Sequence, residues 1–203
     1  MKKSLKRIGI CLLTACVIWC AMILIDRKTL RNELIRLHVV AASDSEADQA
    51  LKLRVRDAVV ESLRENMKNA ADRDQAKAYL QENLPKIEAL ANRVLREAGC
   101  ADTVTVSLLA EEFTTRYYDT FTLPAGIYEA LRITIGEGAG QNWWCVVFPT
   151  LCVGATVEEF GDTAHCAGFS DTLVDTLSAE EGYEVRFFIL DALGRLENFL
   201  HKG

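Results

Sequence analysis

Residues 34–63 read LIRLHVVAASDSEADQALKLRVRDAVVESL, and this stretch decides the fold. Residues 34–41 are apolar and rich in β-branched side chains, which is typical of a buried strand. The polar residues 43–45 then form a turn. From Asp48 onwards apolar side chains recur every three to four residues, and Ser45 with Asp48 has the form of a capping box. The stretch therefore predicts a strand, a turn and an amphipathic helix.

Two further amphipathic helices are predicted. One covers residues 72–98 and is followed by Gly99, which favours a helix end. It contains Pro85, which predicts a break or kink near Asn83 because proline lacks an amide donor. The other helix ends the chain, and we expect its apolar side chains to close the domain: Val185, Phe188, Ile189, Ala192, Leu193, Leu196, Phe199 and Leu200.

The chain between these helices has the composition of strands. Residues 103–108 alternate between polar and apolar side chains, and residues 114–123 are rich in Thr, Tyr and Phe. Residues 131–135 and 143–148 flank a glycine-rich connection at 136–141, which predicts a hairpin. Residues 154–181 have weak periodicity, so we expect a surface excursion there.

Together these elements predict an α+β fold. We expect an N-terminal membrane-targeting helix and then a two-layer domain, in which amphipathic helices pack on one face of an antiparallel-rich sheet. Residues 1–26 would be the signal peptide or membrane anchor, and residues 27–203 a single extracytoplasmic domain.

The N-terminal residues have the pattern of a membrane-inserting segment. Residues 8–25 carry no charged side chain, and they are preceded by Lys2, Lys3, Lys6 and Arg7. Lys and Arg stay on the cytoplasmic side, so the chain after Asp26 should be exported. The apolar length suits both a signal peptide and a short span, and no good Ala-x-Ala site follows, so cleavage stays open. Residues 13–16, LTAC, resemble a lipobox, which leaves lipid attachment as another alternative.

The charge of the exported part bears on its partners. Four of the 23 basic residues lie in the N-terminal flank, and the other 19 stand against 29 acidic residues, a formal net charge of −10. Such a domain should repel nucleic acid and anionic lipid. We therefore expect no nucleic-acid partner.

Four of the seven cysteines lie outside the apolar segment: Cys100, Cys145, Cys152 and Cys166. In an oxidising compartment Cys145 and Cys152 could form a disulfide, or both could be buried thiols. Their spacing fits neither common zinc motifs nor a thioredoxin-like pair. No Gly-Lys-Ser/Thr follows the glycines at 136–140, and a strand comes next, so no phosphate loop is predicted. We expect neither a metal nor a cofactor.

Trp143 and Trp144 are candidate contact residues. Adjacent side chains of a strand point to opposite faces, so only one of the two readily enters a one-sided core. The other could be a rigid anchor for a protein partner, unless a second layer buries both.

His38, Ser43 and Asp44 permit a competing hypothesis. A histidine, a hydroxyl and a carboxylate could form the catalytic cluster of a cell-envelope hydrolase. The alternative is that the turn caps the helix and His38 hydrogen-bonds within the fold. Proximity in sequence does not decide between them.

Two ordered blocks carry a resemblance to a known family. The first is IRLHVVAASDS at 35–45 with DQALKLRVRDAV at 48–59, and the second is LRITIGEG at 131–138 with NWWCVVFPTLC at 142–152. In these blocks the chain resembles the stage II sporulation protein R family. The resemblance spans about residues 30–152 and the terminal helix, and residues 154–181 carry no family motif.

The resemblance implies a signalling protein that is not an enzyme and has no cofactor or small-molecule substrate. Members are made in the forespore and exported into the space between forespore and mother cell. There they trigger a membrane-embedded aspartic protease that matures a mother-cell sigma factor precursor. We expect the partner-binding surface to combine one of Trp143 and Trp144 with the strand–turn–helix edge, whose candidates are His38, Asp44, Asp48, Gln49, Lys52 and Arg56.

Overall fold

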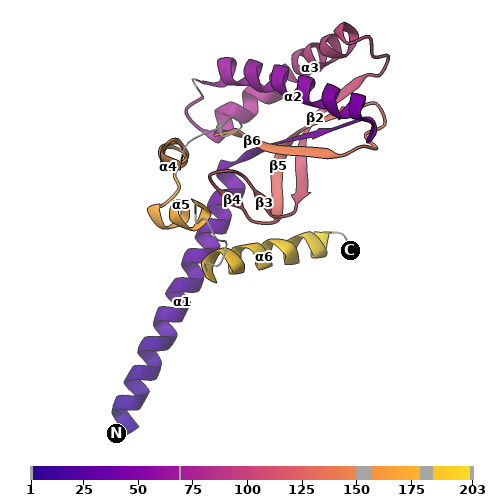
Figure 1. Cartoon of the computed structure of the whole chain (residues 1–203). Helices are drawn as coiled ribbons and strands as arrows, with labels where there is room; N and C mark the ends of the chain where they lie inside the picture. Colours follow the sequence, from indigo (N-terminus) through magenta and orange to yellow (C-terminus); the bar gives the residue numbers. More distant parts are fainter. Residues whose placement is uncertain (1, 69, 150–156, 179–184, 202–203) are drawn as a thin grey trace.

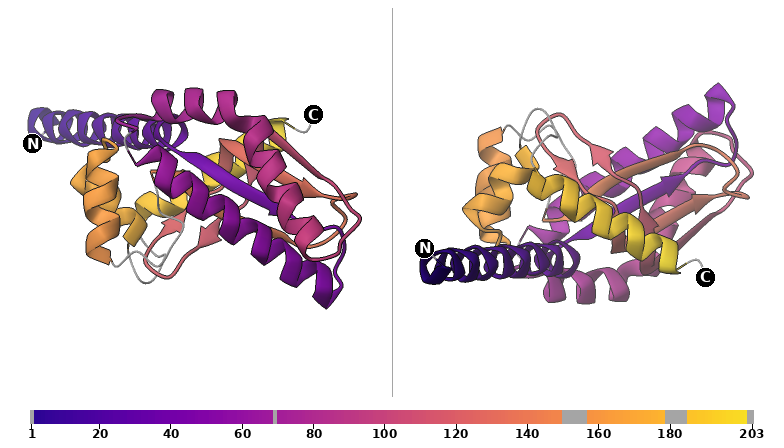
Figure 2. Two further views of the ribbon diagram at one scale, coloured as in Figure 1. Left: turned by 90° about the horizontal axis from the view of Figure 1, so that it is seen from above. Right: turned by 90° about the horizontal axis from the view of Figure 1, so that it is seen from below.

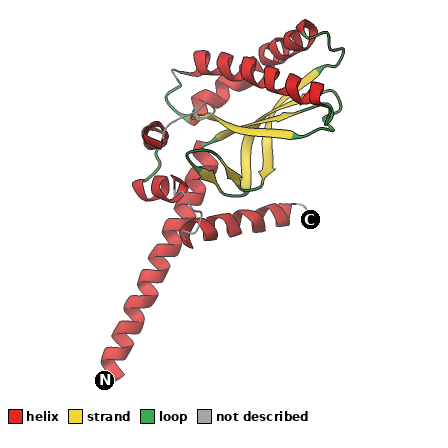
Figure 3. Ribbon diagram, in the orientation of Figure 1, coloured by secondary structure: helices red, strands yellow, loops and turns green. Residues whose placement is uncertain are grey.

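The fold, seen in a computed structural model, is built around a four-stranded mixed sheet (Figures 1 and 3). The structure describes residues 2–68, 70–149, 157–178 and 185–201. The strand order is β2 (Val104–Phe113), β5 (Gly126–Ile135), β1 (Ile35–Val40), β6 (Asn142–Phe148). β1 and β5 are parallel, and the other two pairings are antiparallel. The α+β class and the antiparallel-rich sheet are confirmed.

Two long helices cover one face of this sheet. α2 (Glu46–Met67) is capped at its N-terminus by Ser45, whose hydroxyl accepts a hydrogen bond from the Asp48 amide at 3.1 Å. α3 (Arg73–Glu97) follows and packs on β2, whereas α2 contacts β1 and β6. Alternate residues of β1, such as Leu37 and Val39, belong to the core beneath the two helices. The break predicted near Asn83 does not occur, because α3 runs through Pro85 as one helix. The other alternative, a kink, agrees with the bend of α3 in Figure 2. The buried side chains of α3, including Leu80 and Ile87, hold it to the sheet and offset one lost hydrogen bond.

A second core occupies the opposite face and was not predicted. It is formed by the last turns of α1 (Lys2–Glu33), by α4 (Val157–Cys166), α5 (Asp171–Ser178) and α6 (Val185–His201), and by the short strands β3 (Arg116–Tyr117) and β4 (Thr122–Leu123). The surface excursion expected at 154–181 is wrong for its described part. Helices α4 and α5 bury apolar side chains in this core: Phe160, Ala164, Leu173, Val174 and Leu177.

Helix α1 is apolar, projects from the domain, and is long enough to cross a membrane (Figures 1 and 2). Its apolar side chains up to Ile25 are mostly exposed. The helix continues without interruption past residue 26, and Ile23, Asp26 and Leu30 are buried against the domain. The chain thus has the N-terminal helix expected of a signal peptide or anchor, and the last turns of that helix belong to the folded core.

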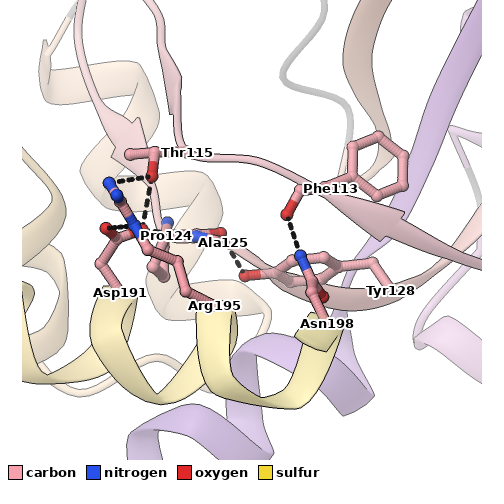
Figure 4. Close-up of polar contacts among 8 residues, drawn as sticks. All are labelled: Phe113, Thr115, Pro124, Ala125, Tyr128, Asp191, Arg195 and Asn198. Atoms are coloured by element: carbon pink, nitrogen blue, oxygen red, sulfur yellow. Dashed lines mark hydrogen bonds and ion pairs between the residues drawn. The ribbon is translucent and has the colours of Figure 1, made fainter. Parts of the chain in front are cut away.

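Helix α6 buries Phe187 and Leu190 in the second core and makes close contacts with the domain through polar and small residues (Figure 4). Asp191 accepts a hydrogen bond from the Ala125 amide at 2.8 Å and pairs with Arg195, and Asn198 donates to the Phe113 carbonyl at 2.9 Å. At Gly194 an added Cβ would lie 1.6 Å from the Ala125 carbonyl oxygen. The terminal helix is confirmed, but its buried face is not the predicted one. Much of the predicted apolar set is exposed: Val185, Phe188, Ala192, Leu196, Phe199 and Leu200.

Candidate interaction surface

The two sequence blocks meet in space at the turn between β1 and α2. The hairpin predicted at 131–148 is wrong, because β1 lies between β5 and β6 in the sheet and the two strands do not pair. Their glycine-rich connection lies against the β1–α2 turn, with Gly140 donating to the Ala41 carbonyl at 3.0 Å. A Cβ at Gly140 would lie 2.2 Å from the Ser43 carbonyl oxygen, so only glycine permits the contact. The Gln141 amide donates to the Asp44 carboxylate at 2.8 Å. Strand β1, the turn, helix α2 and the β5–β6 connection form one unit.

Three of the predicted contact residues hold this unit together. The Asp48 carboxylate accepts a hydrogen bond from the Ser43 hydroxyl, and the side-chain amide of Gln49 donates to the Ser43 backbone carbonyl at 2.8 Å. The Lys52 ammonium donates to Gln49 at 2.6 Å and to the Gln141 carbonyl at 3.1 Å. Burial, and then the neighbouring charge of Arg56, lower the pKa of Lys52. These side chains therefore have structural partners.

Trp143 lies on the α2 side of the sheet. Its half-buried ring packs against the first core, and the Arg56 guanidinium lies 4.7 Å from the ring centroid. Such a contact between a cation and an aromatic face is favourable and keeps both groups in place. Arg56 also pairs with Asp57, which is exposed. Trp143, Arg56 and Asp57 thus form a partly accessible aromatic and charged surface beside the exposed Asp44.

Trp144 lies on the opposite side with His38, as the alternation of the strand predicts. The two residues are paired in register on β6 and β1, and their rings stack with centroids 5.6 Å apart. The Arg116 guanidinium lies 3.3 Å from the Trp144 ring centroid. Both tryptophans are half-buried because each face of the sheet has its own cover. The predicted contact residues thus fall into two groups on opposite sides of the sheet, both reaching strand β6, which lies at one edge of the strand order.

The partners of His38 were missed by sequence reasoning. Its Nδ1 lies 2.9 Å from Glu111, and its Nε2 lies 2.7 Å from Asn142. Glu111 also pairs with Arg132 at 2.7 Å. Burial opposes ionisation of Glu111, but the hydrogen bonds and charges of His38 and Arg132 outweigh burial and hold its pKa below the ordinary value. Only the cross-strand register brings these residues together, because His38 and Glu111 lie on strands separated by β5.

The hydrolase hypothesis can be tested against these contacts. The Ser43 hydroxyl is bonded to Asp48, Asp44 accepts a hydrogen bond from the Gln141 amide, and both ring nitrogens of His38 have other partners. Among the described residues no hydrogen bond joins His38 to Ser43 or Asp44. A triad needs the histidine to reach the nucleophile. The turn instead caps α2, which is the alternative to catalysis that the sequence left open.

Arg36 is a further buried charge in the first block. Its side chain is fully buried, with the guanidinium 4.1 Å from the Phe113 ring centroid and 5.1 Å from that of Tyr128. It donates to the Tyr118 hydroxyl at 2.7 Å. Aromatic faces and one hydrogen bond thus surround a cation that sequence reasoning placed in an apolar strand.

The predicted Cys145–Cys152 disulfide stays a prediction. Cys145 is buried in β6 within the first core, whereas Cys152 lies outside the described residues.

Comparison with known proteins decides the family. A family model described as stage II sporulation protein R matches residues 31–158. The chain is also 32% identical to stage II sporulation protein R of Bacillus subtilis (strain 168), over 81% of this chain and 82% of that protein. The chain belongs to the stage II sporulation protein R family. No solved structure matches it.

The stage II sporulation protein R match can be placed on the fold. It covers the four-stranded sheet, α2, α3 and the surfaces around Trp143 and Trp144. Most of α1, together with α5 and α6, lies outside residues 31–158. The chain is therefore a sporulation protein whose family region is the sheet and its two long helices.

Proposed function

We propose that this protein is an exported signal that activates a membrane-embedded aspartic protease. The protease would then mature the precursor of a mother-cell sigma factor. The protein would act from the space between forespore and mother cell, by binding the protease better in its active state than in its inactive state. Activation of this kind needs no chemistry by the activator itself.

Membership of the stage II sporulation protein R family carries this proposal. Two properties of the chain support it. An apolar N-terminal helix precedes a folded domain, which suits delivery across or to a membrane. In addition, the hydroxyl, imidazole and carboxylate groups of the β1–α2 turn are used for folding contacts rather than gathered around one reacting position.

We place the protease contact on the surface formed by Trp143 and Arg56. A half-buried tryptophan with charged groups at its rim has the anatomy of a binding hot spot. Trp144 is less suited, because it packs against both His38 and Arg116 within the second core. The nearby Lys52, Asp48 and Gln49 would support the contact by fixing the turn.

Reconstitution tests the proposal. The full chain, the candidate protease and the sigma factor precursor would be placed in vesicles, and precursor cleavage would be followed with time. The expected result is cleavage that depends on the full chain. If cleavage proceeds equally without it, the activating function is refuted.

Single substitutions then test the contact separately. Trp143→Ala and Arg56→Ala should each weaken activation, by about 30-fold if the loss is about 2 kcal/mol. Arg54→Ala is the matched control, because Arg54 is exposed on the same helix. Circular dichroism would verify that the variants are folded. Wild-type activation by both Trp143→Ala and Arg56→Ala would exclude this surface and leave the activating function intact.

A further inference from the structure

Helix α6 exposes an apolar stripe. Its members follow helical spacing and are between 53% and 75% exposed: Val185, Phe188, Leu196, Phe199 and Leu200. The side of α6 that faces the domain carries Phe187, Leu190, Asp191 and Gly194. We call the five exposed residues the α6 stripe. Contiguous exposed apolar side chains of this size mark a surface that contacts something other than water.

The rotation of α6 about its axis is fixed, so the stripe cannot turn inwards. Asp191 is bonded to the Ala125 amide and to Thr115 (Figure 4). Gly194 lies directly against the backbone at Ala125. Turning the helix would separate these groups and drive a larger side chain into the Ala125 carbonyl. The stripe must therefore find its contact outside this domain.

Helix α1 sets the position of the stripe. A buried ion pair joins Asp26 of α1 to Arg186 at the start of α6, and Arg27 and Arg31 both pair with Glu197. These contacts begin where the exposed apolar surface of α1 ends, at Ile25. From there α6 runs transversely away from α1 (Figure 1). Seen from the side of the N-terminus, α6 lies in front of the sheet (Figure 2). The stripe thus faces the side on which the apolar part of α1 projects.

Basic side chains lie at the same level. Arg27, Lys28 and Arg31 line a hollow beside α6 together with Glu197. Three cations around one carboxylate leave a local excess of positive charge, in contrast to the acidic domain as a whole. Basic groups at the end of an apolar helix can reach the phosphates of a bilayer while their stems stay in apolar surroundings.

We propose that α6 lies in the interfacial region of the membrane that α1 enters, with the stripe towards the acyl chains. Arg27, Lys28 and Arg31 would then meet lipid phosphates. A bilayer suits this surface better than a protein partner, because the stripe faces the side of the molecule on which the apolar part of α1 projects. One lipid bilayer can therefore contact both. Two helices at different angles would fix the height and tilt of the domain above the membrane. This inference does not depend on protease activation.

Depth-dependent quenching tests the proposal on the full chain. The protein would be placed, one copy per disc, in nanodiscs of phosphatidylcholine with a minority of phosphatidylglycerol. A genetically encoded fluorescent amino acid would replace Phe188, Phe199 or, as control, Leu53, an exposed apolar residue of α2 on the other side of the sheet. Brominated lipid should quench the fluorescence of the probe at 188 and at 199 and leave that of the probe at 53 unchanged. Iodide in the buffer should do the reverse.

Two results would overturn the proposal. If iodide quenches the probes at 188 and 199 as strongly as the probe at 53, and brominated lipid has no effect, the stripe faces water. If iodide reaches these probes in the single-copy discs, but neither quencher reaches them in larger discs that hold two copies, a second copy of the chain covers the stripe. All three substituted positions are exposed, so the fold does not depend on their side chains.

Discussion

Replacing Gly194 with alanine tests how α6 is held. The new methyl group would lie 1.6 Å from the Ala125 carbonyl oxygen and 2.4 Å from its carbon. Ordinary contacts need about 3.5 Å, so the helix would have to move outwards by about 2 Å at this point. Such a shift would separate Asp191 from the Ala125 amide, a bond that is now 2.8 Å long. Gly194→Ala should therefore loosen α6.

The magnitude follows from three terms. Overpacking costs about 1–3 kcal/mol, and losing a buried hydrogen bond costs about 1–3 kcal/mol. Alanine has a higher helix propensity than glycine, which returns about 1 kcal/mol. The free energy of unfolding should fall by about 3 kcal/mol, which for a chain of this size lowers Tm by roughly 5–10 °C.

Thermal unfolding of the full chain in nanodiscs, followed by circular dichroism, would measure the effect. Gly161→Ala in α4 is the matched control, because its new Cβ would meet only Val174, at 3.9 Å. That variant should gain up to about 1 kcal/mol and melt slightly higher. Hydrogen exchange should be faster in α6 of Gly194→Ala only. A Gly194→Ala protein that melts at or above the wild type would refute the close packing of α6 on Ala125.

Two further predictions concern buried charges. Asp26→Ala and Arg186→Ala should each lower the free energy of unfolding by about 3–5 kcal/mol, because either change leaves one buried charge unpaired. The double variant should lose less than the sum of the two, and additive losses in chemical denaturation would contradict this. The pKa of Glu111 is lower in the folded protein than in the unfolded chain, so its contribution to stability is complete above the unfolded value near 4.5 and is lost as pH falls below it. Glu111→Gln should remove that part of the acid dependence, and identical unfolding profiles of variant and wild type below pH 4.5 would count against it.

The Asp26 contact also bears on the N-terminal boundary. A cut after residue 26 would remove Ile23 and Asp26 from the second core and leave Arg186 buried without its carboxylate. The boundary predicted at residue 26 came from charge and hydropathy, which mark where a helix can enter a bilayer. Those patterns do not indicate that Asp26 pairs with Arg186 of α6, which lies 160 residues further along the chain.

Much of the local structure could be predicted because it depends on neighbouring residues. The strand at 35–40, the cap at Ser45 and the amphipathic α2 all follow from short-range periodicity and turn chemistry. The hairpin predicted at 131–148 does not form, because pairing with β1 separates β5 from β6. The opposite orientations of Trp143 and Trp144 follow from the two-residue period of a strand. At Pro85 this reasoning gave two alternatives, and only the break is excluded, since tertiary burial of α3 outweighs the local cost of proline.

The candidate site could be predicted only in part. The residues of the β1–α2 turn were found because they are consecutive, but their roles were not. Lys52 was expected at the partner-binding edge and is buried against Gln141, because the connection between β5 and β6 folds back over it. Glu111 and Arg116 gave no signal, since pairing across the sheet and packing between its layers place them beside His38 and Trp144.

By itself the sequence determined the apolar N-terminal helix, the α+β class and the resemblance to the sporulation family, because each depends on patterns of neighbouring residues. Only the tertiary structure decided that the sheet has a core on both faces, and that α6 turns Asp191 and Gly194 inwards together with Phe187 and Leu190. The reason is that Asp191 and Gly194 are complementary to the backbone at Ala125, a contact between segments 66 residues apart. That contact leaves the apolar stripe outside.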